Sequence, residues 1–216
     1  MKMNKKKVLT LALVLCVVAI LSVGSLAWFN AKDEVKNTFK VATDSEDKVD
    51  FSIDLFEHKA NGDKEDVGLT FENILPGSQL SKDPTIQNTG AYNEYARVKV
   101  TVNHANAWTT ACNKYGISDL ATIFGGYDAA KWTRGEVIAD TNGDTLTYVY
   151  YLNRVLAPNS DEILFTSVTI PTQFVQADFA GMTDFTLDIV AEAIQADNLP
   201  ATVTNAQGAF ALLTAN

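Results

Sequence analysis

The sequence is poor in the residues that form disulfide networks. Only two of its 216 residues are cysteines, and Cys16 lies in an uncharged N-terminal stretch, which leaves Cys112 alone in the rest of the chain. A single thiol forms no internal disulfide, so stability must come from core burial. We expect Cys112 to be a small buried hydrophobic residue; pairing between chains and a nucleophilic role are the alternatives.

Catalytic motifs are also missing. The two histidines, His58 and His104, lie 46 residues apart, and neither is followed by a second ligand within two to four residues. H-E-x-x-H, G-x-S-x-G, P-loop and Rossmann patterns do not occur. Asp140–Asp144 looks like the start of a calcium loop, but position 12 is Tyr151 instead of a bidentate glutamate. We therefore predict no catalytic residue, no cofactor and no metal ligand. Weak calcium binding is the alternative for the carboxylate clusters Asp44–Asp47, Asp63–Asp66 and Asp140–Asp144.

Basic residues are scarce beyond the N-terminus. The whole chain has 17 Lys and Arg against 26 Asp and Glu, a formal charge of −9. Residues 1–27 contain four lysines and no acid, so the remaining 189 residues carry −13. Such a charge repels nucleic acid backbones and anionic lipids. We expect no nucleic-acid partner and interpret the acidity as solubility outside the cell.

The N-terminus has the three parts of a secretory signal peptide. Lysines in Met1–Lys7 precede the uncharged stretch Val8–Val23, and small residues then lead to Ala27. We predict that a signal peptidase cuts between Ala27 and Trp28 and that the protein is secreted to the cell surface or extracellular matrix. The uncharged run Val8–Phe29 is long enough to span a bilayer, so an uncleaved anchor is the alternative; the body is exported either way.

Strand patterns dominate the remainder. Apolar and polar residues alternate in the manner of half-buried strands, clearly in four segments and more weakly in four others. The clear ones are Val49–Leu55, Ala96–Asn103, Leu146–Leu152 and Phe185–Ile189; the weaker ones are Val67–Phe71, Pro84–Asn88, Trp132–Ala139 and Leu164–Ile170.

Turn residues separate these segments, and Asn142-Gly143 predicts a hairpin. Helical spacing is confined to Ile117–Phe124, with Ser118 or Asp119 near its cap, and Ala206–Leu212. We predict an all-β protein, an antiparallel, jelly-roll-like β-sandwich with one or two short helices.

Several fragments occur in the order seen in a known family. They are Ala27–Lys32, Asn37–Phe39, Leu75–Ser78, Lys82–Gly90, Tyr95–Val98, Tyr148–Tyr151, Leu156–Pro158, Leu164-Phe165, Val168–Pro171 and Glu192–Asp197. On these fragments the chain resembles the TasA/camelysin group of exported proteins of Gram-positive bacteria. Val41-Ala42 departs from the group, which commonly has a glycine there, and Tyr115–Arg134 contains no such fragment.

The resemblance implies a jelly-roll-like sandwich, a SipW-type signal peptidase and assembly into biofilm matrix fibres. In TasA-like fibres the N-terminal segment of one subunit adds as a strand to the next, which is called donor-strand complementation. Camelysin-like members are also classed as metalloproteases, but this sequence contains no zinc-ligand set that supports carrying that activity over.

The segment after the predicted cleavage site is the candidate donor strand. We divide the chain into a signal peptide (1–27), this leader segment (28–41) and a sandwich domain (42–216). Exposure of each large apolar side chain costs about 1.5–3 kcal/mol, so the leader segment must dock on its own domain or on a neighbour. The residues expected to drive assembly are Trp28, Phe29, Val35, Phe39 and Val41.

The leading hypothesis is a secreted structural protein that forms a homo-polymer by donor-strand addition, with other matrix or cell-surface proteins as further partners. Docking in cis as an ordinary first strand would instead give a monomer. The competing functions are a camelysin-like secreted metalloprotease and a monomeric surface adhesion module. In the adhesion module the contacts would be Trp108, Tyr127 and Trp132.

Overall fold

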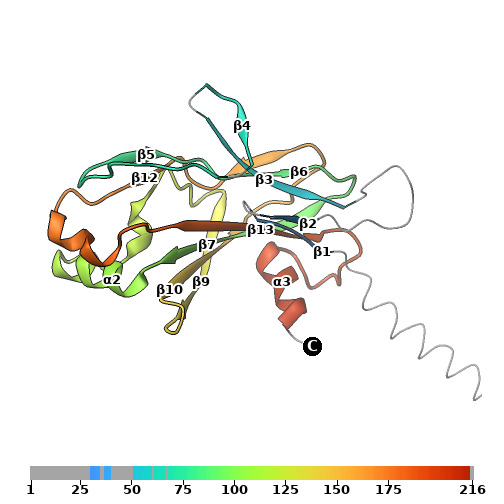
Figure 1. The fold of residues 1–216 in the computed structure, drawn as a ribbon. Coiled ribbons are helices and arrows are strands. Elements are labelled where there is room, and N and C mark those ends of the chain that lie inside the picture. Colours follow the sequence, from blue (N-terminus) through green and yellow to red (C-terminus); the bar gives the residue numbers. More distant parts are fainter. Residues whose placement is uncertain (1–29, 35–36, 40–50, 60, 67, 215–216) are drawn as a thin grey trace, which may run out of the picture.

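The structure is a computed structural model that describes residues 30–34, 37–39, 51–59, 61–66 and 68–214. Its strands form three antiparallel sheets (Figure 1). The largest contains, in spatial order, β2 (Asn37–Phe39), β1 (Asn30–Glu34), β13 (Leu187–Gln195), β7 (Glu94–Asn103), β10 (Thr145–Leu152) and β9 (Trp132–Asp140). The second contains β11 (Asp161–Ile163), β6 (Thr85–Asn88), β3 (Ile53–His58) and β4 (Lys64–Glu65), and the third β5 (Gln79–Ser81), β12 (Ser167–Thr169) and β8 (Phe124–Gly125).

The helices in the described residues are short. They are α2 (Ala105–Lys114), α3 (Ala206–Thr214) and the 3-10 helices η1 (Leu120–Ile123) and η2 (Gln176–Gly181). The arrangement is an all-β sandwich, which confirms the predicted fold class. In the part of the chain that the structure describes, no helix has the length and apolarity needed to cross a membrane.

Alternation places the core between the sheets. Along β7, every second residue from Glu94 to Val102 is buried, and the residues between them are half-buried. Val98 and Val100 share one apolar cluster with Leu55 of β3 and Ile86 of β6. Successive side chains of a strand point to opposite faces. The two-residue period of β7 therefore sets which face of the large sheet packs against the sheet that contains β3 and β6.

The other face of the large sheet is covered by α3, which lies below it in Figure 1. Phe210 of α3 packs 6.1 Å from the Tyr151 ring, and the Arg97 guanidinium lies 4.1 Å from the Phe210 ring centroid. Both distances fit aromatic and cation–π contacts. The helix expected at Ala206–Leu212 is confirmed, and its apolar side covers part of β7 and β10.

Most predicted strands are confirmed. The Asn142-Gly143 hairpin joins β9 and β10, with Thr145 opposite Asp140. The segment predicted from Phe185 begins at Leu187 and runs on to Gln195, and the one predicted from Val49 is a strand only from Ile53, its first residues being outside the described part. The prediction for Val67–Phe71 is wrong over Gly68–Phe71, which form no strand.

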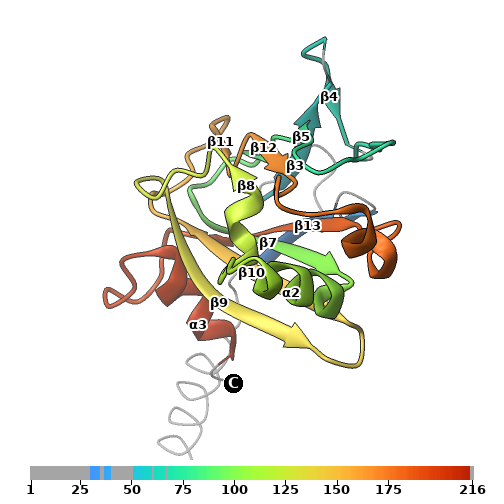
Figure 2. The ribbon, with the colours of Figure 1, turned by 90° about the vertical axis from the view of Figure 1, so that its left-hand side faces the viewer.

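One helix was not predicted. α2 follows His104, which adopts a left-handed conformation (φ 54°) and makes no side-chain cap. Its buried residues are Trp108, Ala111 and Cys112, the spacing of one helical face. Figure 2, viewed from this end of the sandwich, shows α2 (green) beside η2 (orange). Lys114 and Tyr115 both bind Asp178 of η2, at 2.8 and 2.9 Å.

Candidate assembly site

The leader segment forms one edge of the large sheet. β1 pairs antiparallel with β13 of the same chain, from Asn30 opposite Ile194 to Glu34 opposite Val190. β2 then turns back along β1, with Phe39 opposite Lys32. In the isolated chain the leader segment therefore docks in cis. Ala27, Trp28, Phe29, Val35 and Val41 lie outside the described residues, and only the strand position of Phe39 is described.

A charged network joins β13 to β7, its neighbour on the side away from the leader segment. Glu192 accepts hydrogen bonds from Arg97 Nε at 2.6 Å and Lys99 Nζ at 3.0 Å. Burial favours the protonated carboxyl, but the two cations outweigh it and lower the pKa of Glu192. Lys32 of β1 lies opposite Glu192 in the strand register.

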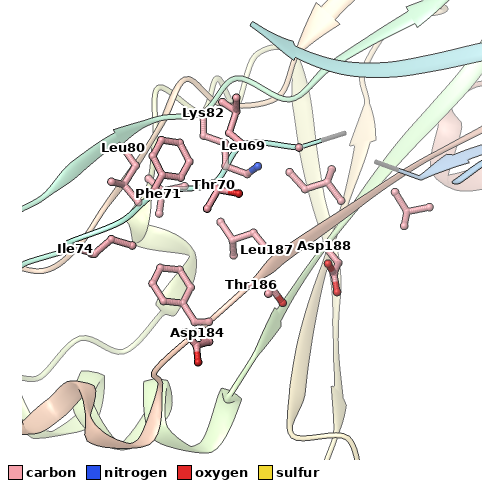
Figure 3. Close-up of a pocket in the computed structure, with 15 residues that line it drawn as sticks. Leu69, Thr70, Phe71, Ile74, Leu80, Lys82, Asp184, Thr186, Leu187 and Asp188 are labelled. Atoms are coloured by element: carbon pink, nitrogen blue, oxygen red, sulfur yellow. The ribbon is translucent and has the colours of Figure 1, made fainter. Parts of the chain in front are cut away.

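Beyond Val190 the edge of β13 opens into a pocket of about 630 Å³. Figure 3 shows Thr186, Leu187 and Asp188 on one side of it and Leu69, Thr70 and Phe71 on the other. Ile74, Leu80 and Val168 line it further, so the lining is mainly apolar. The pocket therefore lies along the same strand that carries β1, just past the last paired residue.

The outer side of the pocket is formed by Gly68–Phe71. This segment makes no ladder with another strand in the described residues. Leu69 and Phe71 are half-buried, and neither belongs to the apolar clusters described for the core. The pocket thus offers two large apolar side chains that are only partly covered. In the sequence, these two side chains are marked by the apolar–polar alternation of Val67–Phe71, which predicts a strand.

A buried ion pair lies behind the pocket. Lys82, which lines it, donates to Glu57 Oε1 of β3. Both side chains are nearly inaccessible, and Glu57 Oε2 has no hydrogen-bond partner. The neighbouring pair His58 Nδ1 and Asp83 Oδ2 is 2.6 Å apart and closer to solvent. These contacts join β3 to the segment before β6, so they fix one side of the pocket.

The other residues considered from the sequence have structural roles. Cys112 is buried within the core cluster, as expected, and burial raises the pKa of its thiol. In the Asp140–Asp144 turn, Asp140 Oδ1 accepts the Asn142 and Gly143 amides at 2.9 and 3.1 Å, and Asp144 Oδ1 accepts the Asn106 amide at 2.8 Å. These carboxylate oxygens therefore already have partners within the turn and at the start of α2.

The aromatic residues proposed for an adhesion surface are mostly internal. Trp108 and Trp132 are fully buried, and Trp132 Nε1 donates to the Ile163 carbonyl at 2.8 Å. Tyr127 is half-buried and donates its hydroxyl to the Trp132 carbonyl at 2.7 Å. The two tryptophans therefore cannot contact a partner without rearrangement of the fold.

Across the described ranges, no group of three or more His, Cys, Asp or Glu residues is placed to hold a metal ion. No family model, curated protein or solved structure matches the chain. We therefore take as the candidate site the pairing of the leader segment with β13 and the pocket that lies beyond the last paired residue.

Proposed function

We propose that this protein is an exported structural protein that polymerises by strand exchange, the leader segment of one copy replacing that of the next on β13. The observation that carries the proposal is the position of the pocket. β1 covers β13 only to Val190, and the pocket begins where that pairing ends. A leader segment that continues straight, instead of turning back as β2, would run through the pocket.

The strand register identifies which residues would enter. Continuing the observed pairing places Val35 opposite Ile189, Asn37 opposite Leu187 and Phe39 opposite Phe185. Directly opposed residues of antiparallel strands lie on the same face, and on β13 the buried Ile189 marks the core face. Val35 and Phe39 would thus face the core side, where the pocket opens. Burying each adds about 1.5–3 kcal/mol.

Exchange between copies keeps the β1–β13 pairs, since the same residues meet in cis and in trans. Only the β1–β2 hairpin changes. The three residues of β2 lose their pairing with β1, and the side chains of Val35 and Phe39 would become buried in the pocket. A contact in which each copy gives its leader segment to one neighbour and accepts another from the opposite side does not close, so it generates a filament.

Signal removal would act as the switch for assembly, because a leader segment still joined to a signal peptide in the membrane would not be free to reach another copy. The resemblance to the TasA/camelysin group and the signal-peptide pattern support the same proposal, with the cell surface or biofilm matrix as the location. Other matrix or cell-surface proteins are the further partners in this proposal.

The test is deletion of residues 28–41 from the exported chain. We expect a folded domain, judged by cooperative unfolding, that stays monomeric on gel filtration while the intact exported chain forms concentration-dependent polymers visible by electron microscopy. A synthetic 28–41 peptide should then bind the deleted domain. Fibres formed by the deletion variant, or an intact chain that is monomeric at all concentrations, would refute the proposal.

A further inference from the structure

Two opposite ends of the sandwich expose apolar side chains on ordered loops. At the end next to α2 and η2, which we call the tip, Leu75 and Val175 are 59% and 48% exposed. At the end where β7 begins, which we call the base, Tyr92 and Val155 are 43% and 37% exposed. The other large exposed apolar residues in the described ranges, Val137, Ile138, Ile163 and Leu213, lie on β9, β11 and α3.

The tip loops are adjacent and held in place. The Gly77 amide donates to the Ile170 carbonyl at 3.0 Å, and the Leu75 amide donates to Ser78 Oγ at 2.9 Å. Val175 N donates to Asp178 Oδ2 at 2.8 Å, at the start of η2. Both apolar side chains are therefore presented by loops whose backbones are already fixed, which limits the entropy lost on docking.

The base is equally well ordered. Asn88 Nδ2 donates to the Tyr92 carbonyl at 2.7 Å and to the Leu156 carbonyl at 2.9 Å, so the loops that carry Tyr92 and Val155 meet at one side chain. The Thr89 amide donates to the Ser52 carbonyl at 3.0 Å. The first described residues of the sandwich domain, starting at Phe51, therefore lie at the base as well.

The direction of the leader segment brings these two ends together in a polymer. It runs along β13 from Ile194, near the base, towards Leu187, near the tip. A straight leader segment thus leaves the acceptor copy at its tip. Residues 40–50 then lead to Phe51 at the base of the donor copy, and eleven residues span at most about 36–40 Å. The base of the donor must therefore lie within about 40 Å of the tip of the acceptor.

From this geometry we infer a second contact between successive copies, distinct from the strand itself: Leu75 and Val175 at the tip of one copy pack against Tyr92 and Val155 at the base of the next. The inference rests on the proposed strand exchange. Once the leader segment is bound, a short tether holds the two ends at millimolar effective concentration, so even a small apolar contact is populated. The contact fixes the orientation of neighbouring copies and so makes the fibre stiff.

Cysteine cross-linking tests this contact. We would mix exported chains carrying L75C and Y92C, treat the mixture with a short bismaleimide during polymerisation, and count covalent dimers on a denaturing gel. The control mixture pairs Y92C with L213C, which places the thiol on α3, away from both ends, at a site that is 39% exposed. We expect at least about tenfold more dimer in the first mixture. Buried Cys112 should contribute none, as a wild-type sample will show.

A second variant separates the two proposals. With residues 28–41 deleted, the L75S/V175S domain should bind the 28–41 peptide as the wild-type deleted domain does, whereas the full exported L75S/V175S chain should form shorter, more flexible fibres. Normal fibres from L75S/V175S, or equal cross-linking in both mixtures while fibres form, would overturn the end-to-end contact and leave strand exchange standing. Failure of the intact wild-type chain to form fibres, together with failure of the wild-type domain lacking residues 28–41 to bind the peptide, would overturn the proposed function and the contact with it.

Discussion

Lys82 and Glu57 form an ion pair inside the sandwich, with the Glu57 carboxylate completely inaccessible to solvent. Lys82 comes from the segment before β6 and Glu57 from β3, so the pair ties the pocket to the smaller sheet. Removing one charge of a buried pair leaves the other charge buried without a partner. This lowers the free energy of unfolding by more than the intact pair contributes to it.

We therefore expect K82M to lower the free energy of unfolding by about 3 kcal/mol. The double variant K82M/E57Q, which has no buried charge, should recover most of this loss. K114M is the matched control, because Lys114 pairs with Asp178 at the surface and its loss should cost less than about 1 kcal/mol. Urea denaturation at pH 7 measures all three. Equal losses for K82M and K114M would contradict the buried-pair interpretation.

Glu94 predicts a pH dependence of stability. It is fully buried in β7, and burial raises its pKa from 4.5 to about 8, against a smaller opposing effect of a hydrogen bond from the Ser52 backbone. Between these values the folded protein holds a proton that the unfolded chain has released. Stability should therefore fall as pH rises from 4.5 to 8, by at most about 1.4 kcal/mol per pH unit.

E94Q cannot ionise and should remove this slope. We expect its advantage over wild type to grow between pH 5 and pH 8 and then level off, as measured by urea denaturation at several pH values. Three other carboxylates have lowered pKa values: Glu192, Asp119 and Asp178. Their contributions to the free energy of unfolding are lost only below about pH 4.5, outside the pH range in which Glu94 acts. An unchanged slope in E94Q would show that Glu94 is not the group responsible.

The pocket makes a separate prediction about the leader segment. F71S removes a half-buried ring from the outer side of the pocket, so it should change the stability of the folded domain by less than about 1 kcal/mol. In the domain lacking residues 28–41, F71S should weaken binding of the 28–41 peptide about tenfold or more, because one large apolar contact is worth about 1.5–3 kcal/mol. Fluorescence anisotropy with a labelled peptide measures this, with L213S as control. Unchanged affinity in F71S would place the leader segment elsewhere.

Cys112 should be unreactive in the folded protein. It is buried beside Trp108 in the core, and burial raises the pKa of its thiol, which keeps it protonated. We expect labelling by a thiol reagent at pH 8 only at the rate at which the domain unfolds, and complete labelling in denaturant. Rapid labelling under native conditions would contradict this placement and would reopen pairing between chains.

Local patterns were most informative where one face of a strand is buried. The alternation in Ala96–Asn103 and in Leu146–Leu152 predicted β7 and β10. With a two-residue period, only one face of the strand carries the apolar side chains, so only one orientation buries them in the core. The turn at Asn142-Gly143 was predicted for the same local reason. Helix α2 was missed because its apolar face comprises only Trp108, Ala111 and Cys112, and His104 provides no cap.

The sequence by itself determined an acidic all-β domain with a basic, then apolar N-terminus and an aromatic leader segment, because charge, period and turn chemistry are local properties. Tertiary structure alone decided that β1 lies on β13, that its pairing stops at Val190, and that Leu69 and Phe71 face the opened edge. These features depend on strands more than 100 residues apart. Only the folded chain brings such strands together, and no local pattern records which edge is left partly uncovered.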